Sequence, residues 1–126
     1  MGLIYTDLTL TNPGRPDLRP ITVRAMADTG AVTLCIPEHV ANQLDLVLAE
    51  EREVTLGDGP VHKVPYVGPV KVQFENRSCF SGALVLGDEP LLGAIQMEDL
   101  DLVLNPSRQT TTVNPESPNI PSAKVK

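Results

Sequence analysis

The stretch Ala27-Asp28-Thr29-Gly30-Ala31 is the most informative part of this sequence. It places one carboxylate on a tight Thr-Gly turn between two apolar stretches. A β-prone segment over 21–25 leads into the turn, and a short apolar segment over 33–36 follows it. By itself, Asp-Thr-Gly is an ordinary turn in which the aspartate caps its own backbone. The surrounding segments must therefore decide between a structural and a chemical role for Asp28.

Length and composition predict one small, mainly β domain. The chain has 126 residues, which is enough for one hydrophobic core and too few for two ordinary domains. Aromatic residues make up only 3%, so aliphatic side chains must fill the core. Twelve prolines and nine glycines favour short elements joined by tight turns. We expect a single domain over 1–113, followed by a proline-rich C-terminal tail over 114–126.

Charge and potential metal ligands argue against several classes of function. The net charge is −6 and no Lys/Arg cluster runs along the chain, so a nucleic-acid groove is not expected. Cys35 and Cys79 have apolar neighbours, which favours buried thiols over a disulfide or metal site. His39 and His62 lie near no Ser or Cys that would suggest a triad. Since no targeting segment or membrane-length apolar run is visible, the sequence predicts a cytoplasmic protein without a membrane partner.

Hydrophobic periodicity and turn residues predict the order of the elements. The expected strands cover 3–10, 21–25, 33–36, 53–56, 61–67, 70–74, 78–86, 102–104 and 109–113. Short helices are expected over 37–44 and 94–100. A glycine-rich tip at 57–59 joins two of the strands into a hairpin, and Gly68-Pro69 is expected to end the second of them.

The chain resembles the retropepsin-like aspartic proteases, the family of the retroviral protease and its small bacterial relatives. The family signature Asp-Thr/Ser-Gly-Ala matches Asp28 to Ala31, its second signature matches Leu91-Leu92-Gly93, and its flap matches the hairpin tip. The resemblance covers roughly residues 21–105. It implies an all-β fold, a small, closed, mainly antiparallel β barrel with one or two short helices.

The resemblance also implies a role for each matched residue. Asp28 is the expected catalytic carboxylate. Support of the active-site loop is expected from Thr29, Gly30 and Ala31. The flap over the substrate is expected from Gly57, Asp58 and Gly59, although the charged Asp58 departs from the apolar tip typical of the family. A structural position under the catalytic loop is expected for Leu91, Leu92 and Gly93.

The implied function is that of a homodimeric aspartic endopeptidase acting on extended polypeptides. Because the chain has one Asp-Thr-Gly, the second carboxylate must be Asp28 of a two-fold-related copy. The two carboxylates activate water, so no metal or organic cofactor is needed. The family resemblance places the dimer seam at 3–10 and 109–113. Two alternatives stay open: a non-catalytic peptide-binding or dimerisation module of the same fold, and a monomeric β domain with a coincidental Asp-Thr-Gly.

Overall fold

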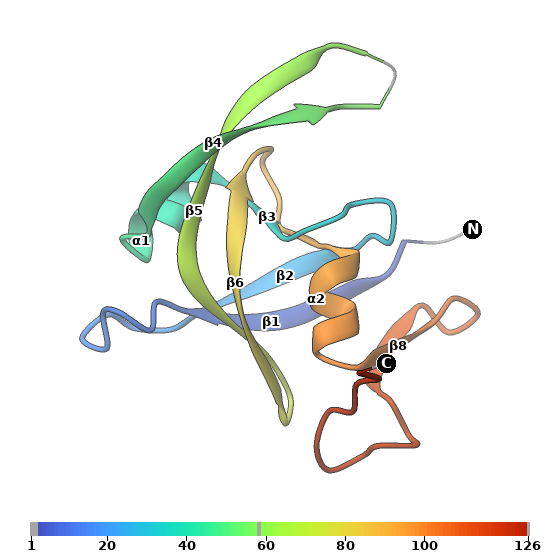
Figure 1. The fold of residues 1–126 in the computed structure, drawn as a ribbon. Coiled ribbons are helices and arrows are strands. Elements are labelled where there is room, and N and C mark those ends of the chain that lie inside the picture. The colour runs from blue at the N-terminus through green and yellow to red at the C-terminus, as the bar shows by residue number, and fades with distance from the viewer. Residues whose placement is uncertain (1–2, 58, 126) are drawn as a thin grey trace.

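The computed structural model describes residues 3–57 and 59–125, which form a mainly β structure with two short helices (Figure 1). In chain order the elements are β1 (Tyr5–Thr11), β2 (Ile21–Ala27), β3 (Cys35–Ile36), α1 (Glu38–Gln43), β4 (Val47–Thr55), β5 (Val61–Phe74), β6 (Arg77–Val85), β7 (Leu91–Leu92), α2 (Ala94–Asp99), β8 (Leu102–Asn105) and β9 (Thr110–Val113). Neither helix of the described residues is long and apolar enough to cross a membrane.

Seven of the strands join one sheet whose pairings run in a ring. The order is β1-β2-β7-β3-β6-β5-β4, and β1 also pairs with β5 at Thr9–Thr11. Most neighbours are antiparallel, whereas β2–β7 and β3–β6 are parallel. Strands β8 and β9 form a separate two-stranded sheet. The mainly β architecture with two short helices is confirmed, and complete closure into a barrel stays a prediction.

An aliphatic core lies between the strands of the ring. Buried side chains alternate along β1 and β5 because successive residues of a strand point to opposite faces. Leu8 and Leu10 of β1 are buried together with Val70 and Val72 of β5. Phe74 is the one aromatic side chain in this cluster, so the described core is aliphatic as the composition predicted.

Strand β5 corrects one prediction, because it continues through Gly68-Pro69 instead of ending there. Its register with β6 shifts between Val67 and Val70. Such an irregularity accommodates Pro69, which has no N–H to donate to a ladder. The two strands expected over 61–67 and 70–74 are therefore one.

Strand β4 is longer than expected and begins at Val47 rather than at residue 53. Its side chains are exposed apart from half-buried Val54, so no alternation of apolar residues marks its beginning. Within the described residues, β4 pairs with β5 alone and lies at the end of the strand order. This exposed edge strand forms one side of the hairpin that rises above the rest of the chain (Figure 1).

The C-terminal segment is attached to the residue that follows α2. Asp101 has a φ of 57°, a left-handed conformation common just after a helix. Its carboxylate accepts hydrogen bonds from Asn114 Nδ2 (3.1 Å), the Ser117 hydroxyl and the Ser122 N–H (2.9 Å). Asn76, in the turn between β5 and β6, donates to the carbonyl of Pro118 (2.9 Å). These contacts tie residues 114–122 to two separate parts of the fold.

Candidate active site

Asp28 lies immediately after β2, in a turn that its own side chain stabilises. Its Oδ1 accepts the N–H of Gly30 at 2.8 Å, and its carbonyl accepts the N–H of Ala31 at 3.1 Å. As a residue Asp28 is half-buried, and Thr29 and Gly30 are exposed. Asp28 therefore does cap its own turn, which is the structural role that the sequence allowed for it. It uses one carboxylate oxygen and leaves the other available for chemistry.

The Leu-Leu-Gly run packs directly against the Asp28 turn. The Asp28 N–H donates to the Leu92 carbonyl at 3.0 Å, because β7 pairs with the end of β2. The Ala94 N–H donates to the Ala31 carbonyl at 2.8 Å. A Cβ on Gly93 would lie 2.5–2.6 Å from backbone atoms of Thr33, so this close approach requires glycine. The structure thus brings together the two segments that carry the sequence motifs.

Gln96 is a residue of this region that the sequence did not single out. Its side chain is 1% exposed, and its Nε2 donates to the Thr33 hydroxyl at 2.9 Å and to the Ser81 hydroxyl at 2.7 Å. It therefore connects α2 to β6 and to the segment that follows the Asp28 turn. Gln96 is one of three polar residues in the segment 94–100, so nothing in the sequence signalled that it is buried, and its two partners are distant in sequence.

The two glycines of the hairpin tip, Gly57 and Gly59, have open space beside them. The Gly59 N–H donates to the Leu56 carbonyl at 2.8 Å, which closes the turn, and Gly57 has a φ of 47°. A Cβ on either glycine would meet no atom within 4 Å. Asp58, the charged residue predicted at the tip, lies outside the described residues. The role of this tip as a flap stays a prediction.

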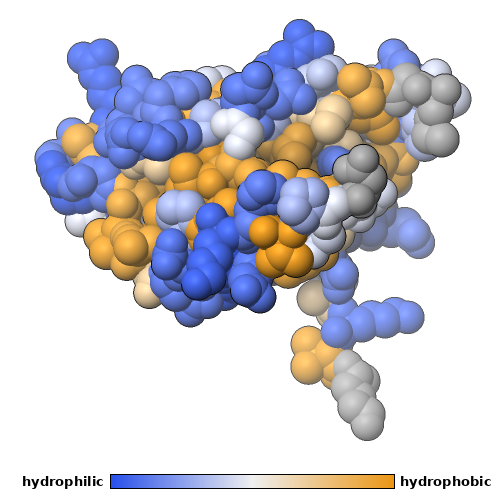
Figure 2. All heavy atoms as spheres, turned by 90° about the horizontal axis from the view of Figure 1, so that it is seen from above, coloured by the Kyte–Doolittle hydropathy of each residue, from blue (hydrophilic) through white to orange (hydrophobic). Residues whose placement is uncertain are grey.

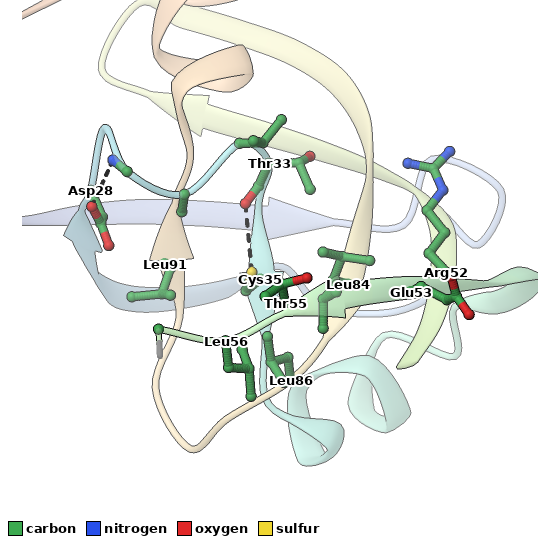
Figure 3. A pocket seen from close by; sticks show the side chains of 15 residues that line it. Asp28, Thr33, Cys35, Arg52, Glu53, Thr55, Leu56, Leu84, Leu86 and Leu91 are labelled. Carbon is green, nitrogen blue, oxygen red and sulfur yellow. Dashed lines mark hydrogen bonds between the residues drawn. The ribbon is translucent and has the colours of Figure 1, made fainter. Parts of the chain in front are cut away.

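A cavity of about 520 Å³ lies between the Asp28 turn and the hairpin. This volume is within the range of small-molecule and peptide side-chain sites. Aliphatic side chains from separate elements dominate its lining, and Asp28 and Arg52 lie toward its two ends (Figure 3). The aliphatic side chains of the lining include Val54, Leu56, Leu84, Leu86 and Leu91.

Both cysteines are buried free thiols, as the sequence predicted. Cys35 borders the cavity, and burial raises the pKa of its thiol, with a smaller contribution from the negative charge of Asp28. Burial in the core, with a smaller contribution from Asp99, raises the pKa of Cys79 to about 12. Because the thiolate is the reactive form, neither side chain is suited to act as a nucleophile at neutral pH. The described residues hold no group of three or more His, Cys, Asp or Glu side chains that could bind a metal ion.

Exposed apolar side chains flank the Asp28 turn, and one of them, Val32, also borders the cavity. Val32 is 69% exposed and Ile95 is 54% exposed, and a hydrogen bond from the Ile95 N–H to the Val32 carbonyl (3.0 Å) holds them side by side. Leu3, 60% exposed, borders a second cavity together with Asp28 and Thr29. Seen from the hairpin side, apolar surface runs across the middle of the molecule between hydrophilic margins (Figure 2).

Comparisons with known proteins support the fold but not a family or an activity. No protein-family model matches the chain, and no curated protein matches its sequence. The solved structures that match include the retroviral protease-like domain of Ddi1 from Leishmania major, with a TM-score of 0.60 and 14% sequence identity. The match covers 91% of this chain and 90% of that chain. At this identity the likeness shows the fold alone, which is similar to that of a retroviral protease-like domain.

Proposed function

We propose that the chain is a homodimeric aspartic endopeptidase. The observation that carries the proposal is the position of Asp28, a half-buried residue whose carboxylate borders an aliphatic cavity of about 520 Å³ on a retroviral protease-like fold. The Gly30 N–H orients one carboxylate oxygen. The substrate would be an extended polypeptide whose aliphatic side chains occupy the leucine-lined cavity.

The need for two carboxylates leads to the proposed dimer. Aspartic protease chemistry uses a pair of carboxylates about 3 Å apart that share one proton. The sequence has a single Asp-Thr-Gly, so a two-fold axis beside Asp28 would supply the second copy. Such an axis would bury Val32 and Ile95, whose exposure in one subunit is otherwise unfavourable. The exposed Thr29 would lie in the same contact.

Each carboxylate would then have a distinct role. The ionised one accepts a proton from a water molecule, which attacks the scissile carbonyl. The protonated one donates to the carbonyl oxygen and stabilises the tetrahedral intermediate. As the C–N bond breaks, the dyad passes the proton that it took from water to the leaving amine. Activity would therefore follow a bell-shaped pH profile whose two limbs belong to the pair.

The hairpin would cover the bound peptide. Its backbone groups around Gly57 and Gly59 would pair with the extended substrate, as in strand addition. The open space around both glycines leaves room for such closure. A cytoplasmic location remains a prediction of the sequence.

Cleavage of an unbiased peptide mixture tests this proposal. The wild-type protein and Asp28→Asn are incubated with the mixture between about pH 4 and 7, and new termini are identified by mass spectrometry. We expect cuts with the wild-type protein alone. Cuts that persist in Asp28→Asn would contradict the proposal.

One observation favours the second candidate, a non-catalytic peptide-binding module. The hydrogen bond from Gly30 to Asp28 Oδ1 gives the carboxylate a structural task that a binding protein would also need. No cuts from a wild-type protein shown to be dimeric by sedimentation would favour this module. A monomer would favour a β domain without a dyad.

The proposed dimer contact has its own test. Val32→Asp places a charge beside the two-fold axis without changing the dyad, and we expect it to weaken dimerisation at least tenfold by sedimentation. Phe80→Asp, at a similarly exposed position (66%) on β6, is the matched control and should leave dimerisation unchanged. Equal effects of the two substitutions would place the contact elsewhere.

A further inference from the structure

The geometry points to a subsite for an acidic substrate residue: Arg52 binds a glutamate or aspartate side chain of the polypeptide at the end of the cavity remote from Asp28 (Figure 3). This inference rests on the proposed function, because it names the class of polypeptide that the same cleft selects.

Strand alternation places Arg52 on the inner face of the hairpin. Arg52 pairs in register with Val64, which is 7% exposed and packs with Leu84. Glu53 pairs with exposed Lys63 and belongs to the opposite face. Although Glu53 also borders the cavity, its side chain points away from that of Arg52 (Figure 3).

The Arg52 guanidinium is held in place before any ligand arrives. Its Cζ lies 3.6 Å from the centroid of the Tyr66 ring, and its Nε donates to Glu50 Oε2 at 2.9 Å. The Tyr66 ring in turn lies against Gly82, where a Cβ would come within 2.2 Å of it. Because the stack on Tyr66 orders the guanidinium whether or not Glu50 stays bound to it, binding a carboxylate costs less conformational entropy.

The same guanidinium keeps donors for a ligand. Arginine has five N–H groups, and the hydrogen bond to Glu50 uses one of them. The side chains of Arg52 and Glu50 are 44% and 57% exposed, and ion pairs at this exposure are weakly held. A substrate carboxylate can therefore join or replace Glu50 in a bidentate contact.

Among the charged residues that line the cavity, one could produce a preference for acidic substrate residues. Arg52 is the sole cation among the described residues that line the cavity, and leucines separate it from Asp28. The chain as a whole carries a net charge of −6, which favours basic peptides over acidic ones. A preference for acidic residues would therefore have to come from Arg52 itself.

Peptide capture tests the inference independently of cleavage. Full-length Asp28→Asn protein is immobilised and offered a randomised peptide library, and the captured peptides are sequenced by mass spectrometry. We expect Glu and Asp to be enriched about tenfold over Gln and Asn at one position relative to an aliphatic residue. Adding Arg52→Gln should abolish this enrichment. Adding Lys63→Gln, which removes the same charge from the outer face, should preserve it.

The competing carboxylate provides a second comparison. Glu50→Gln removes the negative charge that competes for Arg52 and should increase the acidic enrichment more than Glu53→Gln, which makes the same charge change on the outer face. Several outcomes overturn the inference: no captured peptides, no acidic enrichment, enrichment that survives Arg52→Gln, or equal effects within either matched pair.

The experiments distinguish failure of the proposed function from failure of this inference. Acidic enrichment on Asp28→Asn together with an absence of cleavage by the wild-type protein would remove the protease and leave the acidic subsite. Cleavage of peptides without an acidic preference would remove the subsite and leave the protease.

Discussion

The Asp28 turn and the β4–β5 hairpin face each other across the cavity, and the chain holds them in opposite ways. The turn is fixed by backbone hydrogen bonds to the segment 92–95, from Asp28 to Leu92, from Ala94 to Ala31 and from Ile95 to Val32. Strand β4 is almost fully exposed and pairs, within the described residues, with β5 alone. The difference indicates that the Asp28 turn is held rigidly and that the hairpin is the more mobile of the two regions.

Glycine substitutions give the largest expected contrast between these regions. Gly93→Ala forces a methyl group to within 2.5–2.6 Å of the Thr33 backbone, which cannot move aside as a side chain could. We expect a loss of about 3 kcal/mol in the free energy of unfolding, measured with urea. Gly59→Ala at the hairpin tip meets no atom within 4 Å and should change stability by less than about 0.5 kcal/mol. Similar losses for both would show that the two regions are equally packed.

The buried amide of Gln96 gives the next largest effect. Gln96→Ala removes the donor to the Thr33 and Ser81 hydroxyls, and we expect a loss of about 2 kcal/mol in the same urea experiment. Gln43→Ala, at an exposed position on α1, is the matched control and should change stability by less than about 0.5 kcal/mol. If Gln96→Ala behaves as Gln43→Ala does, the link between α2 and the Asp28 region contributes nothing to stability.

The smallest expected effect is a pH-dependent contribution of Asp101 to stability. It tests whether the C-terminal segment is also held firmly to the fold. Hydrogen bonds from the Ser117 hydroxyl, the Ser122 N–H and Asn114 lower the pKa of Asp101 below its usual value. Because the folded pKa is lowered, the stability it contributes is present above the ordinary aspartate pKa and is lost as the pH falls through the lowered one.

The Ser122 amide reports this titration. Its NMR shift should change with a midpoint below about 3.9, the usual pKa of aspartate, and the change should be absent in Asp101→Asn. A midpoint at or above the usual value would mean that the segment does not rest on Asp101 in solution.

Local signals predicted the motifs and the helices, and they failed where pairing partners decide the structure. Pro37 and Gly93 mark the starts of α1 and α2, so both helices were predictable within one or two residues. The beginning of β4 was missed because Val47–Arg52 is exposed and shows no alternation. The break expected at Gly68-Pro69 was wrong because a register shift against β6 absorbs the proline.

The candidate site was predictable in its residues but not in its surroundings. Asp-Thr-Gly and Leu-Leu-Gly are visible in the sequence, and both lie at the β2–β7 pairing. The stack of Arg52 on Tyr66 and the bridge from Gln96 to Thr33 depend on contacts between distant segments. Periodicity within one segment carries no information on such contacts.

Subunit mixing tests the central claim, that one Asp28 from each of two copies forms the catalytic pair. Wild-type protein is mixed with a ninefold excess of Asp28→Asn, and the rate of peptide cleavage is measured after exchange. With random pairing, about one tenth of the original activity should remain, because most wild-type subunits are then paired with a subunit that lacks the carboxylate. Activity that is unchanged by the excess would contradict the shared dyad and show that each subunit acts alone.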